Sequence, residues 1–203
     1  MTSSIDLVLF DIGGVLGSNG WDREQRMAAV ERFGLDDEDF QYRHEEMVGA
    51  LEAGQISLGE YLDVTVFCDG RTFSREEFTS FMLAQSVPWA DSIAVARELA
   101  ESATVRLATL NNESEALNNY RIERFGLREI FPTFFTSCWL GVRKPTREIY
   151  TRVLGMTQAD PKRTLFIDDR VQNLNPAAAL GMQSIHFESA GQLRSALAAR
   201  GLL

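Results

Sequence analysis

The chain of 203 residues has the composition of an ordinary globular protein, with 45 % hydrophobic and 24 % charged residues. Its formal net charge is −9 and its Lys and Arg residues form no cluster, so nucleic acids and anionic membranes are not expected partners. Two cysteines are too few for a disulfide framework, and the apolar run near the N-terminus is shorter than a signal or membrane segment. We therefore expect a cytoplasmic protein, and its oligomeric state stays open.

The first predicted element is a buried parallel strand over residues 5–10, a short apolar run that ends at Asp11. From residue 21 to about residue 85 the pattern changes, because apolar residues recur there at three-to-four spacing. This spacing predicts helices over residues 21–34, 36–54, 57–67 and 74–85. The segment between the first strand and Pro88 is therefore predicted to be an all-helical insert.

After Pro88, helical and strand patterns alternate along the chain. The predicted helices are 90–102, 113–126, 146–155, 175–181 and 190–201, and the predicted strands are 105–110, 133–137, 164–168 and 184–187. Such alternation is typical of βαβ units and a parallel sheet. We expect a doubly wound, Rossmann-like α/β core formed by residues 1–16 and 88–203, with residues 17–87 inserted as a helical cap.

Polar residues follow several of the predicted strands, at the sheet edge where ligands bind in this fold class. They are Asp11, Asn111 with Asn112, and Asp168 with Asp169, and Lys144 precedes the helix predicted at 146–155. Each has a local alternative explanation. The Asp-x-Gly-Gly sequence is common in turns, and Asn112 could cap the next helix with Glu115 three residues on. The segment around Lys144 could be a solvated loop before a helix, and the segment that begins with Asp168 could be a capped turn.

Taken together, these residues favour a site for phosphoryl transfer. Three carboxylates at neighbouring strand ends would repel one another, with raised pKa values, unless a cation lies between them. Carboxylate oxygens suit Mg²⁺, which binds one or two carboxylates plus a substrate phosphate. Lys144 would then offset phosphate charge, and a carboxylate that is not fully engaged as a ligand can attack phosphorus and form an aspartyl-phosphate.

The chain resembles the haloacid dehalogenase (HAD) superfamily, whose four motifs appear in order. They resemble "VLFDIGGVL", "LATLNN", "RKPTREIY" and "LFIDDRVQNLNPAAALGM". The resemblance implies that Asp11 is the nucleophile, that Lys144 is catalytic and binds phosphate, and that Asn111, with Asn112 beside it, stands where the family has a phosphate-binding Ser or Thr.

The same resemblance implies a Mg²⁺ site and a position for the cap. Asp169 would be a direct ligand and Asp168 an accessory one, beside Asp11 and the backbone carbonyl of Gly13. The helical insert lies at a common cap position of the family, where it would close over the site and select the substrate.

Gly13 departs from the family pattern, because phosphatases of this family usually have an Asp there that protonates the leaving group and later activates water. General acid–base catalysis contributes roughly 10²- to 10⁴-fold. We therefore expect slow turnover, or preference for leaving groups that need little protonation, such as anomeric sugar oxygens, acyl groups or aryl groups. His44 and His186 show no partner in the sequence and are expected to be structural.

The leading interpretation is a Mg²⁺-dependent phosphatase that acts on a small phosphorylated metabolite. One alternative is a 2-haloacid dehalogenase, in which Asp11 would attack carbon, although the intact acidic pair argues against that chemistry. Another is a non-catalytic phosphate-binding or partner-binding protein on the same scaffold.

Overall fold

The computed structural model describes residues 5–203, and in this part of the chain five parallel strands form one sheet. The strands are β1 (Leu7–Phe10), β2 (Arg106–Asn111), β3 (Phe134–Thr136), β4 (Thr164–Asp168) and β5 (Gln183–His186). Their order across the sheet is β3-β2-β1-β4-β5, so β1 is central. The predicted fold class, a doubly wound parallel α/β sheet, is confirmed.

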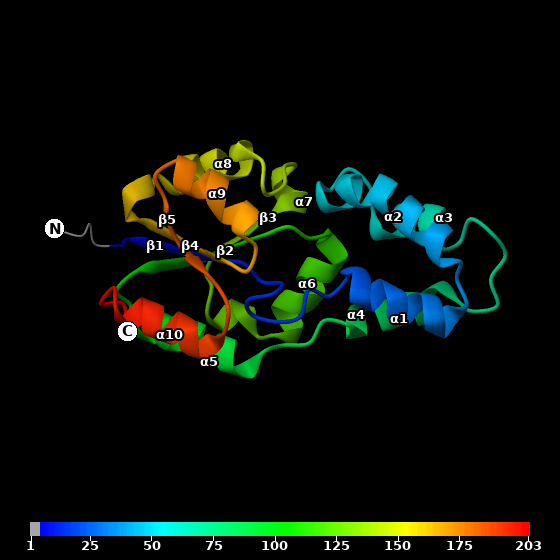
Figure 1. Ribbon diagram of the computed structural model, residues 1–203, viewed down its shortest axis with the longest axis horizontal. Coiled ribbons are helices and arrows are strands. Elements are labelled where there is room, and N and C mark those ends of the chain that lie inside the picture. The colour runs from blue at the N-terminus through cyan, green and yellow to red at the C-terminus, as the bar shows by residue number, and fades with distance from the viewer. Residues whose placement is uncertain (1–4) are drawn as a thin grey trace.

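Helices cover both faces of the sheet (Figure 1). On one side lie α5 (Ala90–Ser102) and α10 (Ala190–Ala198), and on the other lie α8 (Arg147–Thr157) and α9 (Val171–Ala179). Successive side chains of a strand point to opposite faces. Accordingly, Val8 and Phe10 join the apolar cluster beneath α5 and α10, whereas Leu7 and Leu9 join the cluster beneath α8 and α9. Burial on both faces explains why the β1 sequence is continuously apolar.

The insert predicted after the first strand consists of helices packed beside one end of the sheet (Figure 1). They are α1 (Arg23–Phe33), α2 (Asp37–Glu52), α3 (Leu58–Thr65) and α4 (Arg75–Ala84). These helices share an apolar cluster that includes Phe40, Tyr61 and Phe78, and among the described residues of the sheet-bearing part only Leu117 belongs to it. This packing supports the predicted division into a core and a cap at residues 17–87, which remains a prediction.

Two segments connect the cap to the core, and they lie side by side. Gly17 and Pro88 form an isolated antiparallel bridge, and the Ser18 backbone N–H donates to the Val87 carbonyl at 2.9 Å. The Ser18 hydroxyl bonds to the same neighbouring segment through the Gln85 carbonyl, at 2.7 Å. The chain therefore enters and leaves the cap at one place.

Most predicted elements agree with the structure to within a few residues, but three details differ. The helix predicted to start at residue 113 with Asn112 as its cap is α6 (Glu115–Arg124), and Ser114 is its N-cap. The helix predicted over 175–181 starts earlier, at Val171, and contains Pro176 inside it. Short helical turns at α7 (Ser137–Leu140), η1 (Leu127–Glu129) and η2 (Pro161–Arg163) were not predicted, because such turns are too short to show periodicity.

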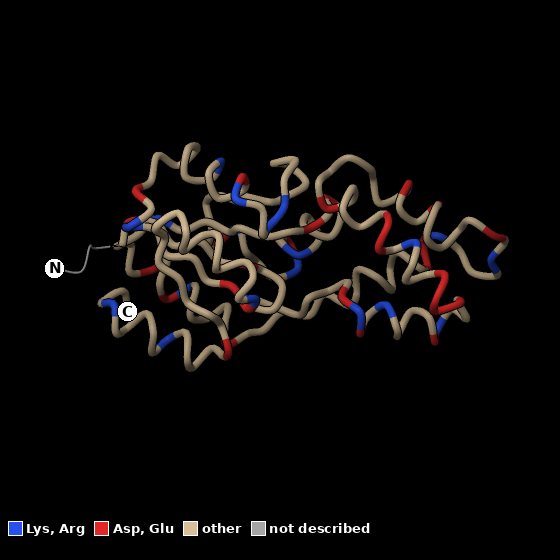
Figure 2. The backbone as a smooth tube through the Cα atoms, turned by 45° about the horizontal axis from the view of Figure 1, so that its top comes forward, with Lys and Arg blue, Asp and Glu red and all other residues tan. Residues whose placement is uncertain are grey.

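None of the described helices is long and apolar enough to cross a membrane. Acidic and basic residues are interspersed along the chain (Figure 2).

Candidate active site

The candidate site lies at the carboxyl ends of β1 and β4, where the chain order in the sheet reverses. β1 is flanked by β2 and β4, so the loops that follow β1 and β4 diverge and leave a crevice between them. The parallel register pairs Phe10 with Ile167, and the Asp11 backbone N–H donates to the Ile167 carbonyl at 2.9 Å. As a result, one carboxylate oxygen from each of Asp11, Asp168 and Asp169 lies within 4.8 Å of the others.

Lys144 completes this cluster from the loop before α8. Its Nζ lies 2.9 Å from Asp11 Oδ2 and 2.6 Å from Asp168 Oδ2, and the residue is only 3 % exposed. Asn112 fixes the Lys144 backbone twice, because its side chain donates to the Lys144 carbonyl and accepts from the Lys144 N–H, each at 2.8 Å. The loop after β2 therefore holds the loop that carries the lysine.

The two acids after β4 have different surroundings. Asp168 is fully buried and accepts from Lys144 Nζ, from the Arg170 backbone N–H at 2.8 Å and from Asn173 Nδ2 at 3.0 and 3.1 Å. In contrast, Asp169 Oδ1 is buried and has no hydrogen-bond partner among the described residues. Asp168 is thus engaged in positioning its neighbours, whereas Asp169 has an oxygen available for a cation.

Burial and mutual repulsion perturb these carboxyl groups. Burial raises the pKa of Asp11 to about 8; the Lys144 ammonium opposes the shift, and the charges of Asp168 and Asp169 add to it. Burial and the Asp168 charge likewise raise the pKa of Asp169. Burial acts to lower the pKa of Lys144, but the two adjacent carboxylates outweigh it and raise that pKa, so the lysine stays charged. A cation between Asp11 and Asp169 would favour their ionised forms.

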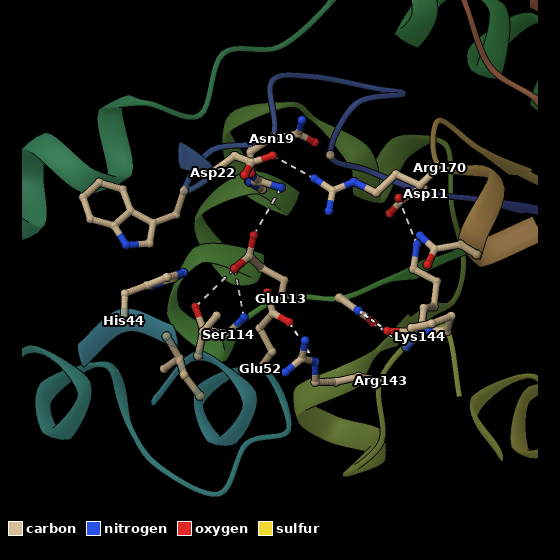
Figure 3. Close-up of a pocket in the computed structure, with 18 of the residues that line it drawn as sticks. Asp11, Asn19, Asp22, His44, Glu52, Glu113, Ser114, Arg143, Lys144 and Arg170 are labelled. Atoms are coloured by element: carbon tan, nitrogen blue, oxygen red, sulfur yellow. Dashed lines mark hydrogen bonds and ion pairs between the residues drawn. The ribbon is translucent and has the colours of Figure 1, made fainter. Parts of the chain in front are cut away.

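A cavity of about 300 Å³ lies beside this cluster, lined by Asp11, Lys144 and side chains of the helical insert that we call the cap. Figure 3 shows Asp11 and Lys144 on one side of it and the cap residue His44 on the opposite side. The core and cap residues at the cavity form ion pairs with one another, at 2.8 Å between Arg170 and Asp22 and at 2.9 Å between Arg143 and Glu52. Burial raises the pKa of Glu52 to about 7, against the opposing charge of Arg143.

Comparison with known proteins identifies the family. A model of haloacid dehalogenase-like hydrolases matches residues 5–181, which is most of the chain. The chain belongs to this family. The HAD membership expected from the sequence motifs is confirmed, and the protein is a hydrolase.

This hydrolase is similar to enzymes that act on phosphorylated compounds. It is 32 % identical over 149 residues to a flavin mononucleotide hydrolase of Arabidopsis thaliana, an alignment that covers 70 % of this chain and 58 % of the relative. The chain thus spans less than two thirds of that relative. It is 23 % identical to a D-ribitol-5-phosphate phosphatase of Bacteroides thetaiotaomicron, over 94 % of this chain and 95 % of the relative.

The solved structures that resemble the hydrolase include a HAD family enzyme of Bacteroides thetaiotaomicron in complex with magnesium and inorganic phosphate. Its TM-score is 0.76 and its sequence is 23 % identical, with 93 % of this chain and 96 % of that chain covered. At this identity the likeness shows the fold alone.

The structure brings most of the predicted site residues of the hydrolase together. Asp11, Gly13, Asn112 and Lys144 line the cavity, whereas Asp168 and Asp169 lie beside Asp11 but are not among the lining residues. Asn111 is not among its lining residues: it is 1 % exposed, donates to Asn118 Oδ1 at 3.0 Å and accepts from the Thr136 hydroxyl at 3.3 Å. The side chain of Asn111 is therefore engaged within the core, whereas Asn112 lines the cavity with both ends of its amide bonded to the Lys144 backbone.

Several cavity residues were not found from the sequence. Arg26 on α1, His44 on α2 and Arg121 on α6 all line the cavity, but a single buried polar residue on a helix gives no distinguishing pattern. His44, expected to be structural without a partner, has one in Tyr61, whose hydroxyl lies 2.8 Å from His44 Nδ1. The spacing of apolar and aromatic residues in the cap predicted its buried helix faces. It did not indicate which residues line the cavity.

Proposed function

We propose that the protein is a Mg²⁺-dependent phosphatase that acts on a small phosphorylated metabolite through an aspartyl-phosphate on Asp11. The observation that carries this proposal is the convergence of Asp11, Lys144, Asp168 and Asp169 in one cluster, of which Asp11 and Lys144 line a cavity. The named activities of the relatives, and the magnesium and phosphate bound by a protein of the same fold, support it.

The acidic cluster fits a magnesium ion. Asp11 and Asp169 would hold it, with the Gly13 carbonyl as the third protein ligand, and the unpartnered Asp169 Oδ1 is the atom best suited to a new ligand bond. Asp168 would act as the accessory acid, because both of its oxygens accept hydrogen bonds. When bound, Mg²⁺ would neutralise the carboxylates and the negative charge on the substrate phosphate.

The residues of the chain then perform a double displacement. A carboxylate oxygen of Asp11 forms a bond to phosphorus while the bond from phosphorus to the ester oxygen breaks, and the leaving group departs with that electron pair. Water then attacks phosphorus, the bond to Asp11 breaks, and inorganic phosphate and the free carboxylate are formed. Lys144 is placed to bind a phosphate oxygen and to hold Asp11 in position, since its ammonium already contacts that carboxylate.

Gly13 restricts the substrates that can react quickly. A glycine cannot protonate the leaving oxygen, and that loss is worth roughly 10²- to 10⁴-fold, or about 3 to 5 kcal/mol of barrier. An alkoxide leaving group would experience this loss fully. Phenolates, carboxylates and anomeric sugar oxygens leave without much protonation. We therefore infer that the substrate is an aryl phosphate, an acyl phosphate or an anomeric sugar phosphate.

Phosphate release from phenyl phosphate, acetyl phosphate and glucose 1-phosphate tests the proposal. We expect turnover with Mg²⁺, none with a chelator, and none in Asp11→Asn, which keeps the shape of the side chain but removes the nucleophile. Chloride release from 2-haloacids in the presence of chelator would instead support the dehalogenase alternative. Tight Mg²⁺-dependent binding of these phosphates without turnover would support a binding protein. The cytoplasmic location remains a prediction.

A further inference from the structure

We propose that Arg26 and His44 form a subsite for an anionic group on the leaving-group end of the substrate, so that the preferred substrate is a phosphomonoester with a second acid. This inference rests on the proposed function. Both residues belong to the cap and line the cavity that covers Asp11. Figure 3 shows His44 and Asp11 on opposite sides of that cavity.

The other cations of the cavity are already neutralised by carboxylates. Arg170 pairs with Asp22, Arg143 with Glu52, Arg121 with Glu113, and Lys144 with Asp11. Each arginine contacts one carboxylate and Lys144 contacts two, Asp11 and Asp168, so these groups have no positive charge left to offer a second acid. The chemistry that distinguishes one end of the cavity from the other must therefore come from the remaining polar groups.

Among the described residues that line the cavity, Arg26 is the cation that forms no such ion pair. It is 8 % exposed, and its guanidinium donates to neutral groups, from Nε to Gln41 Oε1 and from Nη1 to the Trp21 carbonyl, each at 2.8 Å. Its Nη2 makes no hydrogen bond to any described residue, and no described carboxylate forms an ion pair with it. The charges of Asp22 and Glu45 act on Arg26 only from beyond ion-pair distance. A buried guanidinium at a cavity without a carboxylate in direct contact is suited to a ligand carboxylate or phosphate.

His44 adds a hydrogen-bond donor of defined orientation. Trp21 Nε1 donates to the Tyr61 hydroxyl at 3.1 Å, and Nδ1 of His44 lies 2.8 Å from the same oxygen. Among the described residues, that nitrogen is the available acceptor for the Tyr61 proton, so Nδ1 accepts and the proton of the neutral imidazole resides on Nε2. Nε2–H has no partner among the described residues. Arg26 and His44 thus present two donors from the cap.

The cap also contributes apolar side chains to the lining of the cavity. They are Trp21, Val48, Leu51 and Met82. An aromatic ring fits this lining, and a phenolate is one of the leaving groups that Gly13 tolerates. We therefore infer an aryl phosphate, or a similar flat phosphate of good leaving ability, with a carboxylate or second phosphate at the far end.

The test compares 4-carboxyphenyl phosphate with 4-carbamoylphenyl phosphate, which has nearly the same shape but no second charge. We expect kcat/KM to be at least about tenfold higher for the carboxylate, since a site built around a charged partner discriminates strongly against a neutral analogue. Arg26→Gln should bring the ratio close to one, and His44→Phe should lower it by roughly three- to tenfold.

Matched variants separate recognition from folding. Arg23→Gln removes the same charge from the exposed face of α1 and should preserve the ratio. Arg26→Lys should keep part of the ratio, because one positive charge remains. A purely structural defect would lower kcat/KM for both substrates equally and leave the ratio intact. That result in Arg26→Gln, or a wild-type ratio near one with turnover of both substrates, would overturn the inference while the phosphatase proposal stands.

A binding measurement keeps the inference testable if neither ester is hydrolysed, an outcome that would count against the phosphatase. Two-bond ¹H–¹⁵N spectra of the protein, which has two histidines, should show the Nε2–H tautomer for His44, assigned with His44→Gln. Addition of 4-hydroxybenzoate should shift the Nε2 resonance in the wild type and not in Arg26→Gln. Binding that leaves this resonance unmoved, or no binding at all, would contradict the subsite.

Discussion

At the scale of single residues, Gly14 is the position where the backbone most directly determines the site. Its φ is +72°, and a Cβ atom built there would overlap the carboxylate of Asp169. Both observations require glycine: L-residues are strained at this φ, and the close approach of Asp169 leaves no room for a methyl group. The first strand's loop therefore lies against the acid that we assign to the metal.

We predict that Gly14→Ala will impair metal-dependent activity more than folding. The methyl group would push Asp169 away from Asp11, so phosphate release should fall by at least about tenfold and half-maximal activity should need more Mg²⁺. Titration of activity with Mg²⁺ measures both effects. Gly191→Ala is the control, because a Cβ atom meets nothing within 4 Å there. Equal activity in the two variants would mean that Asp169 is not required where we place it.

His44 makes the stability of the protein sensitive to acid. Burial, reinforced by the nearby charge of Arg26, lowers the pKa of His44 to about 4, from 6.5. The imidazole takes up a proton less readily in the folded state than in the unfolded state. The contribution of His44 to the free energy of unfolding is therefore complete above about pH 6.5. It is lost progressively as the pH falls from there towards 4. The loss amounts to at most about 3 kcal/mol.

We predict that His44→Gln will flatten the decline of unfolding free energy between pH 6.5 and pH 4. Urea unfolding at a series of pH values measures this dependence. His186→Gln, at the exposed second histidine, is the matched control and should retain the wild-type slope. If both variants showed the same acid-induced loss as the wild type, the decline would have to come from other groups.

At the scale of elements, Arg121 joins α6 of the core to both segments that lead into the cap. Its guanidinium donates to the Asn19 carbonyl at 2.6 Å and to the Ser86 hydroxyl at 3.2 Å, and it pairs with Glu113 at 3.2 Å. The side chain is 2 % exposed. A Cβ atom at Gly20 would overlap the guanidinium, so the entering segment must pass close above it. One buried arginine therefore fixes where the cap is attached.

We predict that Arg121→Met will lower the free energy of unfolding by about 3 kcal/mol, since it leaves the buried Glu113 and the linker carbonyls without a partner. The double variant with Glu113→Gln should recover part of that loss, because it also removes the unpaired acid. Chemical denaturation of the two single variants and the double variant gives the coupling energy. Strictly additive effects would show that the pair contributes nothing to the attachment of the cap.

The elements themselves were predictable where one local pattern decided them. The β1 run is apolar because both faces are buried, and its end at Asp11 located the candidate site. The N-cap of α6 was not predictable, because Asn112 and Ser114 are both good caps. Ser114 caps α6 in the structure, whereas the Asn112 side chain binds the Lys144 backbone, 32 positions away. A contact between residues so far apart in the sequence cannot be predicted from the local pattern. The positions of Arg26 and His44 at the cavity could not be predicted for the same reason.

At the scale of the whole molecule, the acidic cluster couples metal binding to stability. Three carboxylates that converge on one point destabilise the folded chain, and a cation bound there would be lost on unfolding. A ligand present at 100 times its Kd stabilises a protein by about 2.7 kcal/mol. For a chain of this size that corresponds to an increase in Tm of roughly 5 to 10 °C.

We predict that Mg²⁺ will raise the Tm of the wild type by this amount and will have little effect on Asp169→Asn. This variant removes one repelling charge from a buried cluster, so without metal it should melt above the wild type. Scanning calorimetry with Mg²⁺ and with chelator measures both effects in one series. Glu101→Gln, at an exposed acid of α5, is the control and should respond to Mg²⁺ like the wild type.

A Tm increase in Asp169→Asn as large as in the wild type would place the cation elsewhere. If Mg²⁺ changed neither Tm, the acids would have to be accommodated by protonation, which the raised pKa of Asp11 makes the physical alternative.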